Sequence, residues 1–185
     1  NARKSGISSL WDILDKTATP LGKRYLKYTL LNPIIDSEAI NNTYDAVEDF
    51  QKKYKSRHVY DIIFNSMKSI NDIQRLHRKM ALKKLQPYEF ISLDCSYKNI
   101  KAVIKSLTEI SSEDDFKIIK SEILDNNFQN QLDIYIHDYN QKIKMNEILG
   151  DNLNTITTSF FEKGVFPEID EEQSKLERYK DYFNK

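Results

Sequence analysis

The side chains that most often carry catalysis or hold metals are few and scattered in this sequence. The three histidines lie far apart, and none belongs to a short His-x-x-x-His or Cys-x-x-Cys pair: His58, His77 and His137. Zinc sites usually combine such residues at short spacings, so a zinc site is poorly supported. Cys95 has no neighbouring histidine, and its nearest basic neighbour along the chain is Lys98. We therefore expect Cys95 to be a small core residue rather than a nucleophile.

Phosphate loops and acid–base pairs are no better supported. The four glycines are isolated, and none belongs to a Gly-x-x-x-x-Gly-Lys loop: Gly6, Gly22, Gly150 and Gly164. Carboxylates cluster at residues 113–115 and 168–172, where a helix should start in each case. Complementarity to the helix dipole explains both clusters without catalysis. The sequence thus predicts no active site.

Basic residues offer the one candidate contact to phosphates. Arg75, Arg78, Lys83 and Lys84 lie on or just after a predicted helix and could meet a nucleic-acid backbone weakly. The same four residues could equally form the solvated face of an amphipathic helix. Both interpretations stay open from the sequence.

The composition narrows the class of protein. The chain has 185 residues, 28 Lys+Arg against 28 Asp+Glu, 39% hydrophobic residues and one cysteine. No apolar run approaches the ~18 residues of a membrane span, and one cysteine cannot form an internal disulfide. Few glycines and prolines favour a helical protein, which we expect to be intracellular. A first residue other than Met suggests a piece of a longer protein.

Charge is neutral in total but uneven along the chain. Residues 1–35 and 68–105 are rich in Lys and Arg, whereas residues 109–138 carry eight acidic residues against two basic ones. These blocks could be solvated helix faces of mixed sign, or surfaces that meet other domains or a phosphate backbone.

Helical periodicity dominates the whole sequence. It predicts helices over residues 8–16, 20–32, 37–50, 57–66, 70–85, 87–107 and 113–124, a Lys-rich helix ending at 149 and a last helix from about 168. Residues 128–137 are ambiguous. Thr19 and Asp36 are predicted N-caps, Pro20 suits the first helical position, and Pro33 should end the second helix.

Residues 9–26 form the most specific motif. They read Ser-Leu-x-x-x-Leu-Asp-x-Thr-x-Thr-x-x-Gly-x-Arg-x-Leu, with Thr17, Thr19, Gly22 and Arg24 at the marked positions and Pro33 following. This segment resembles the start of the core (lever) domain of the MutS family of DNA mismatch-recognition ATPases. Residues 68–82, which contain Asp72, Arg75, Leu76 and Arg78, resemble the family's Asp-hydrophobic-x-Arg-Leu-x-x-Arg helix, and residues 161–171, which contain Gly164, resemble a later part of the same domain.

The sequence also departs from the family pattern. Thr29 stands where the family often has Trp, and residues 109–160 match only as helix-forming sequence.

The resemblance implies an all-α fold, an irregular bundle of eight or nine helices. Residues 1–160 would be the first half of the core domain, and residues 161–185 would start a long arm helix toward a clamp. The segment would transmit nucleotide state to DNA clamping and would itself be non-catalytic, with ATP and Mg bound elsewhere in the parent protein. Implied partners are other domains of the same chain, mismatched duplex DNA through the parent and a second subunit in a dimer, but no membrane.

Local physical chemistry predicts structural roles for the same motif. Thr19 should cap a helix, and Gly22 should allow close approach of a neighbouring helix. Arg24 could pair with a carboxylate inside the domain, cap carbonyls of a neighbouring helix or contact another domain. A second hypothesis for the chain is a freestanding helical interaction module, and a third, weaker one is an enzyme with an unrecognised carboxylate pair. If half of a core is missing, some apolar surface should be exposed.

Overall fold

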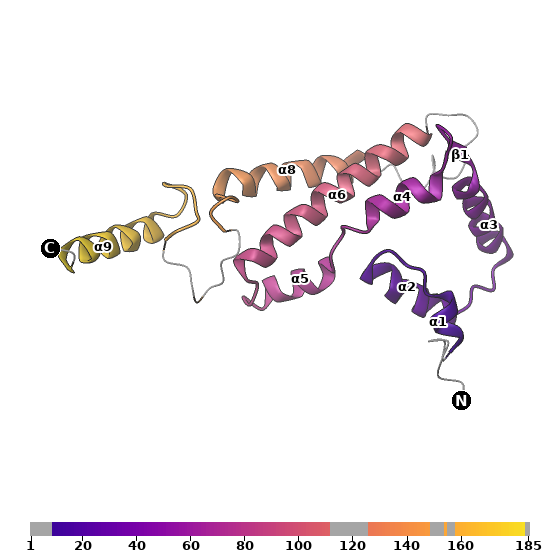
Figure 1. The fold of residues 1–185 in the computed structure, drawn as a ribbon, viewed down its shortest axis with the longest axis horizontal. Coiled ribbons are helices and arrows are strands. Elements are labelled where there is room, and N and C mark those ends of the chain that lie inside the picture. Colours follow the sequence, from indigo (N-terminus) through magenta and orange to yellow (C-terminus); the bar gives the residue numbers. More distant parts are fainter. Residues whose placement is uncertain (1–8, 112–125, 149–153, 155–157, 184–185) are drawn as a thin grey trace. The chain divides into compact units, whose positions relative to one another are not determined.

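The computed structural model describes residues 9–111, 126–148, 154 and 158–183 (Figure 1). These residues form eight helices and one two-stranded hairpin. In chain order the elements are α1 (Leu10–Leu14), α2 (Pro20–Leu31), α3 (Ser37–Gln51), β1 (Lys53–Tyr54), β2 (Arg57–His58), α4 (Val59–Met67), α5 (Ile73–Ala81), α6 (Pro87–Ser111), α8 (Asn126–Lys142) and α9 (Pro167–Phe183). The predicted all-α class is confirmed, with the hairpin as a small addition.

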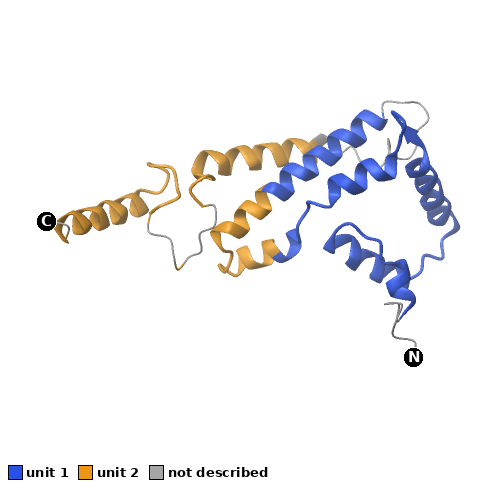
Figure 2. Cartoon of the chain, viewed as in Figure 1, with its two compact units in different colours: residues 1–75, 95–125 blue, residues 76–94, 126–185 orange. Residues whose placement is uncertain are grey.

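The chain divides into two compact units (Figure 2). Unit 1 comprises residues 1–75 and 95–125, and unit 2 comprises residues 76–94 and 126–185. The predicted helix over residues 113–124 lies outside the described residues.

Capping residues set the first helices of unit 1. Ser9 and Asp12 form a capping box at α1, and the Thr19 hydroxyl accepts a hydrogen bond from the N–H of Gly22 with Pro20 at the first position of α2. The Asp36 carboxylate caps α3 in the same way, accepting from the N–H of Ala39. The predicted caps and the end of α2 before Pro33 are confirmed.

The core of unit 1 lies between α4 and α6. Val59 and Ile63 of α4 pack with Leu107 and Ile110 of α6, and all four are buried. Partly buried side chains surround this cluster: Phe50, Tyr54, Ile62, Met67 and Val103. Burial of such side chains supplies the main stabilisation of the unit.

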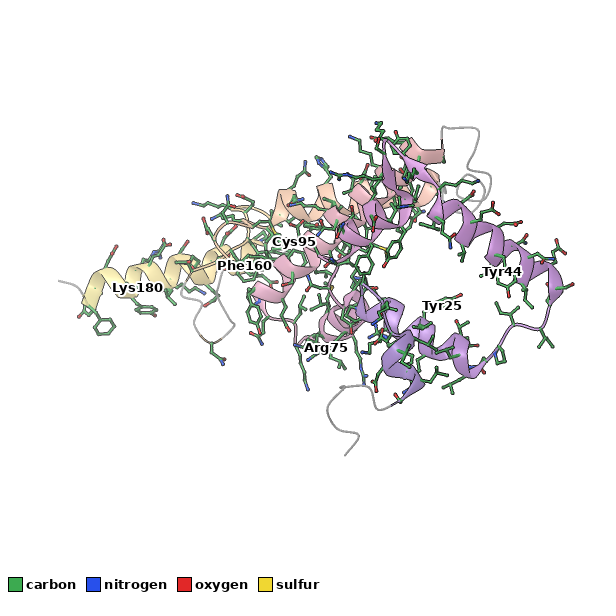
Figure 3. The ribbon with its side chains drawn as sticks, turned by 45° about the vertical axis from the view of Figure 1, so that its right-hand side comes forward. Tyr25, Tyr44, Arg75, Cys95, Phe160 and Lys180 are labelled. Carbon is green, nitrogen blue, oxygen red and sulfur yellow. The ribbon has the colours of Figure 1, made fainter. Side chains whose placement is uncertain are left out.

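Helices α1 and α2 bury none of their own residues. Tyr25 of α2 and Tyr44 of α3 are 70% and 67% exposed (Figure 3). Leu10, Leu31 and Ile35 are at least as exposed as Tyr25. The expectation of exposed apolar surface is thus confirmed along the first three helices of unit 1 and their connections, and α9 of unit 2 also exposes Tyr182 and Phe183.

The hairpin replaces a predicted helix start. β1 and β2 pair antiparallel, with Lys53 opposite His58 and Tyr54 opposite Arg57. The two-residue loop has φ of 47° at Lys55 and 68° at Ser56, as a type I′ turn requires. Such turns favour Asn-Gly, so the Lys-Ser pair gave no hairpin signal, and the helix expected from about residue 57 begins two residues later, at Val59.

Replacing Lys55 by Asn together with Ser56 by Gly should raise the free energy of unfolding by about 1 kcal/mol. Positions 55 and 56 have left-handed backbone, which asparagine and glycine adopt more easily than lysine and serine. Urea denaturation followed by circular dichroism measures the change. Ser106→Gly in the interior of α6 is the control and should destabilise, since glycine there only adds freedom to the unfolded chain. Lower stability of the hairpin variant would contradict the turn assignment.

Unit 2 combines most of α5 and the first residues of α6 with α8 and α9. Its buried apolar side chains include Leu93, Leu132, Tyr139 and Ile148. The ambiguous residues 128–137 are helical and belong to α8. The predicted helix to residue 149 instead ends at Lys142, because the next residues pair with an extended segment. The Lys144 N–H donates to the Phe160 carbonyl at 2.8 Å, and Ile143 bridges Phe161.

Helix α5 is shorter than predicted at both ends. It stops at Ala81 because Lys83 adopts φ of 55°. The N–H groups of Lys83 and Lys84 then bond back to the carbonyls of Met80 and Lys79, as in a Schellman motif.

One single-residue prediction for α6 was wrong. Cys95, expected in the core, is exposed, since its neighbours on both sides in α6 occupy the buried face (Figure 3).

Candidate functional site

The motif of residues 15–24 folds into a compact junction at the start of α2. The Thr17 hydroxyl donates to the Asp15 carboxylate at 2.7 Å, and the Lys23 ammonium lies 2.6 Å from the same carboxylate. The hydrogen bond from Lys23, followed by that from Thr17, holds the pKa of Asp15 below its usual range. Both threonines of the motif therefore have structural roles, Thr17 through Asp15 and Thr19 as the N-cap.

Gly22 belongs to this junction rather than to a helix–helix contact. A Cβ at Gly22 would lie 3.1 Å from the Thr19 hydroxyl and 3.6 Å from the Thr17 Cβ. The nearest atoms are those of the preceding loop, so the structure gives Gly22 a local role, and the close approach of a neighbouring helix stays a prediction. Pro33 lies exposed in the connection between α2 and α3, where it follows the C-cap Asn32.

Arg24 reaches across unit 1 to residues 48 and 50 positions later. Its two terminal nitrogens donate to the two oxygens of Asp72 at 2.7 and 2.8 Å, and one also donates to the Gln74 amide oxygen at 2.8 Å. This bidentate geometry is the strongest form of an Arg–carboxylate pair. It corresponds to the intradomain alternative for Arg24.

Asp72 also lies directly before α5. Its Oδ1 accepts the N–H of Arg75 at 3.2 Å, so one carboxylate serves both the start of α5 and Arg24. The hydrogen bonds that Arg24 donates to Asp72 are the main cause that lowers the pKa of Asp72, and the same hydrogen bonds raise the pKa of Arg24. Asp15, Asp72 and Gln74 were not singled out from the sequence. Asp15 and Asp72 do lie inside the two motifs, and that position is the sequence signal that could have identified them.

The four predicted phosphate contacts are all exposed. Arg75, labelled in Figure 3, belongs to unit 1, whereas Arg78, Lys83 and Lys84 belong to unit 2. Next to Arg78, the Lys79 ammonium pairs with Glu89. The exposure of these residues agrees with a solvated helix face and is compatible with phosphate contact, so the contact stays a prediction.

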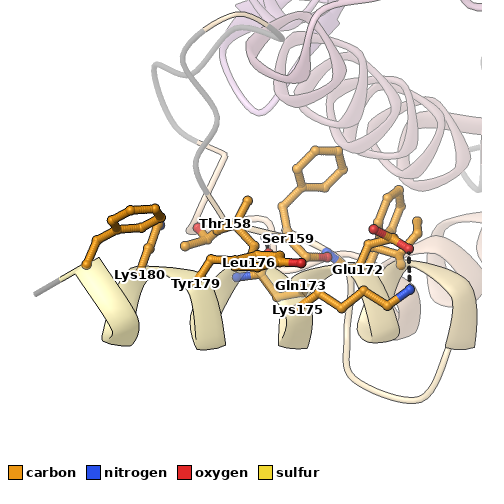
Figure 4. Close-up of a pocket in the computed structure, with 12 residues that line it drawn as sticks. Thr158, Ser159, Glu172, Gln173, Lys175, Leu176, Tyr179 and Lys180 are labelled. Carbon is orange, nitrogen blue, oxygen red and sulfur yellow. Dashed lines mark hydrogen bonds and ion pairs between the residues drawn. The ribbon is translucent and has the colours of Figure 1, made fainter. Parts of the chain in front are cut away.

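In each unit, residues that the structure describes line a large apolar groove. In unit 1, a groove of about 730 Å³ lies along α1 and α2. Leucines and Trp11 form its apolar lining, and Lys23, Arg24 and Lys27 also line it. In unit 2, a groove of about 850 Å³ lies along α9 against residues 158–161 (Figure 4). Leu176 and Tyr179 line it, and Lys175 crosses its edge to Glu171 and Glu172, whose carboxylates raise the pKa of Lys175.

Among the residues that the structure describes, no group of three or more His, Cys, Asp or Glu side chains is arranged to hold a metal ion. Within the same residues, no helix is both long enough and apolar enough to cross a membrane.

Comparisons of this sequence with a family model and with curated proteins point to the same family. The sequence model of MutS domain III matches residues 1–183. The chain is 35% identical over 176 residues to a DNA mismatch repair protein MutS homologue of Acanthamoeba polyphaga mimivirus, covering 94% of this chain and 15% of that protein. It is also 35% identical over 112 residues to the DNA mismatch repair protein MutS of Caldanaerobacter subterraneus subsp. tengcongensis, covering 60% of this chain and 12% of that protein.

The DNA mismatch repair protein MutS of Clostridium novyi is 34% identical over 120 residues, which are 65% of this chain and 13% of that protein. The chain thus spans only 12–15% of the length of these curated relatives. No solved structure matches it significantly. Because the domain model covers nearly the whole sequence, and because the two motifs joined by Arg24 and Asp72 are those that resembled it, this chain belongs to the MutS domain III family.

Proposed function

We propose that this chain is the core, or lever, segment of a MutS-like DNA mismatch-recognition ATPase and that it transmits nucleotide state to DNA clamping. Residues 1–160 are the first half of the core, and residues 161–185 start the arm toward the clamp. The segment performs no chemistry itself: ATP and Mg bind elsewhere in the longer protein. That protein acts inside the cell, as a dimer, on mismatched duplex DNA.

The ion pair between Arg24 and Asp72 is the observation that carries this proposal. A lever needs helices that move together, and this pair ties the start of α2 to the start of α5 with two parallel hydrogen bonds. Arginine is the residue suited to such a planar, two-point link, which lysine cannot reproduce. The structural tie joins two segments that resemble the family and lie 48 residues apart.

Arg24→Gln in the longer protein should weaken nucleotide coupling without removing mismatch binding. ATP changes the dissociation rate of mismatched DNA in a coupled enzyme, and we expect that change to shrink about fivefold or more, as loss of a coupling free energy requires. Stopped-flow dissociation from a labelled mismatched duplex, with and without ATP, measures it. Asp72→Asn should give the same result, and the double variant should add little to either.

Lys23→Gln is the matched control, because it removes one cation of α2 whose partner, Asp15, lies within the local junction. It should leave the ATP effect intact. Equal loss of coupling in Lys23→Gln, or intact coupling in Arg24→Gln, would contradict a transmitting role for the pair.

The groove over α1 and α2 supports a second candidate, a helical protein-interaction module. Its leucines are exposed, and its edge is cationic. A Gly-x-x-x-x-Gly-Lys loop further along the same reading frame would favour the mismatch-repair ATPase over this alternative.

A further inference from the structure

The hairpin and the residue before it form a small, strongly basic surface in unit 1. Residues 52–58 read Lys-Lys-Tyr-Lys-Ser-Arg-His and contain no carboxylate. All of them except Lys52 and Tyr54 are exposed. We call residues 52–58 the basic hairpin. Neither the helical periodicity nor the proposed lever role accounts for it.

The strand register spreads the cations over both faces of the basic hairpin. Lys53 stands opposite His58, and on the other face Arg57 stands opposite Tyr54. Lys55 occupies the turn, with its ammonium 4.8 Å from the centre of the Tyr54 ring. Neither Lys53 nor Arg57 forms an ion pair with another residue that the structure describes.

The base of the basic hairpin is firmly held. The Lys52 ammonium pairs with the buried Asp49 carboxylate at 2.6 Å, and the Val59 N–H donates to the Lys52 carbonyl at 3.0 Å. Val59 is itself fully buried in the core cluster, and Tyr54 packs against that cluster. The cations are therefore presented on a fixed support, which lowers the entropy cost of binding.

The backbone of the turn is a second observation that points to a function of the basic hairpin. A lysine and a serine occupy left-handed backbone, which costs about 1–2 kcal/mol at each position. Backbone strain of this kind concentrates where function maintains it. Here the strained Lys55 places a cation at the tip of the hairpin.

We propose that the basic hairpin contacts the phosphate backbone of duplex DNA, independently of its sequence. This inference rests on the proposed function, since it assumes that the longer protein encloses DNA. The contact would be an additional, electrostatic one that steadies the lever segment against the duplex.

The surface chemistry favours DNA over an acidic protein. Protein interfaces have an apolar centre, whereas the exposed side chains of the basic hairpin are all polar or charged. A phosphate backbone needs only positive charge within reach.

Replacing both Lys53 and Arg57 by Gln tests the proposal. We expect binding of the 185-residue chain to a labelled, fully matched 20-base-pair duplex to weaken about tenfold at 50 mM salt. The slope of log affinity against log salt should fall in magnitude by about 2, because two phosphate contacts are lost. Fluorescence anisotropy over a salt series measures both, and circular dichroism confirms that the variant is folded.

Arg178→Gln with Lys180→Gln is the matched control, because it removes one Arg and one Lys from exposed positions on α9 and gives the same net charge. It should leave the slope unchanged. An equal effect of both double variants, or an unchanged slope in the hairpin variant, would overturn the proposal. So would hairpin-dependent binding of poly-L-glutamate that is tighter than binding of the duplex, which would indicate an acidic protein partner. Since the assay uses matched DNA and no nucleotide, its failure is separate from a failure of the coupling test on Arg24.

Discussion

Ile110→Ala is expected to lower the free energy of unfolding by about 3 kcal/mol, within the usual range of 2–5 for such truncations. Ile110 is 1% exposed and packs from α6 against Val59 and Ile63 of α4. Truncation to alanine removes three carbon atoms from this contact and leaves a cavity that two helices cannot close. Urea denaturation at pH 7 measures the change.

Ile134→Ala on α8 is the matched control, since Ile134 is 69% exposed. It should change the free energy of unfolding by no more than about 0.5 kcal/mol. If Ile110→Ala were equally mild, the α4–α6 cluster would not be the core of unit 1.

Tyr139→Phe is expected to cost about 2 kcal/mol, the usual value for a hydrogen bond to a charged group. The Tyr139 hydroxyl donates to Oδ1 of Asp94 at 2.6 Å, and the two residues are 6% and 4% exposed. Phenylalanine keeps the ring and its edge-to-face contact with Phe90, so the loss isolates the hydroxyl. Removing one donor from a buried carboxyl group is costly because no bulk water replaces it. Thermal and urea unfolding at pH 7 measure the difference.

Tyr182→Phe, at a position 77% exposed on α9, controls for the loss of a hydroxyl and should be nearly neutral. A double-mutant cycle with Asp94→Ala isolates the pair. Additive effects of Tyr139→Phe and Asp94→Ala would show that the two side chains do not stabilise each other.

Capping residues and prolines made the first residues of several helices predictable. Thr19 followed by Pro20 sets the start of α2, Asp36 sets the start of α3, and Pro87 opens α6, as the structure shows. Each signal involves hydrogen bonds or dihedral limits within about four residues. The all-α class followed from helical periodicity, and the family from motifs at fixed spacing.

Other features had no local signal. The hairpin turn uses Lys55 and Ser56, whose types do not favour left-handed backbone, so its formation depends on the core that holds its base. Helix α8 ends at Lys142 because residues 143–144 pair with residues 160–161, which lie far along the chain. Periodicity alone would continue the helix.

The sequence by itself determined the helical class, the caps and the membership of a MutS-like core, since these depend on neighbouring residues and on motif spacing. The tertiary structure alone decided which charges meet. Arg24 had three open roles until Asp72 was placed beside it, and Gln74 completes that contact. The tertiary structure also buried Asp94 against Tyr139 and left Cys95 exposed. Such pairings join residues tens of positions apart, and only the packing of the helices brings those side chains within hydrogen-bond distance.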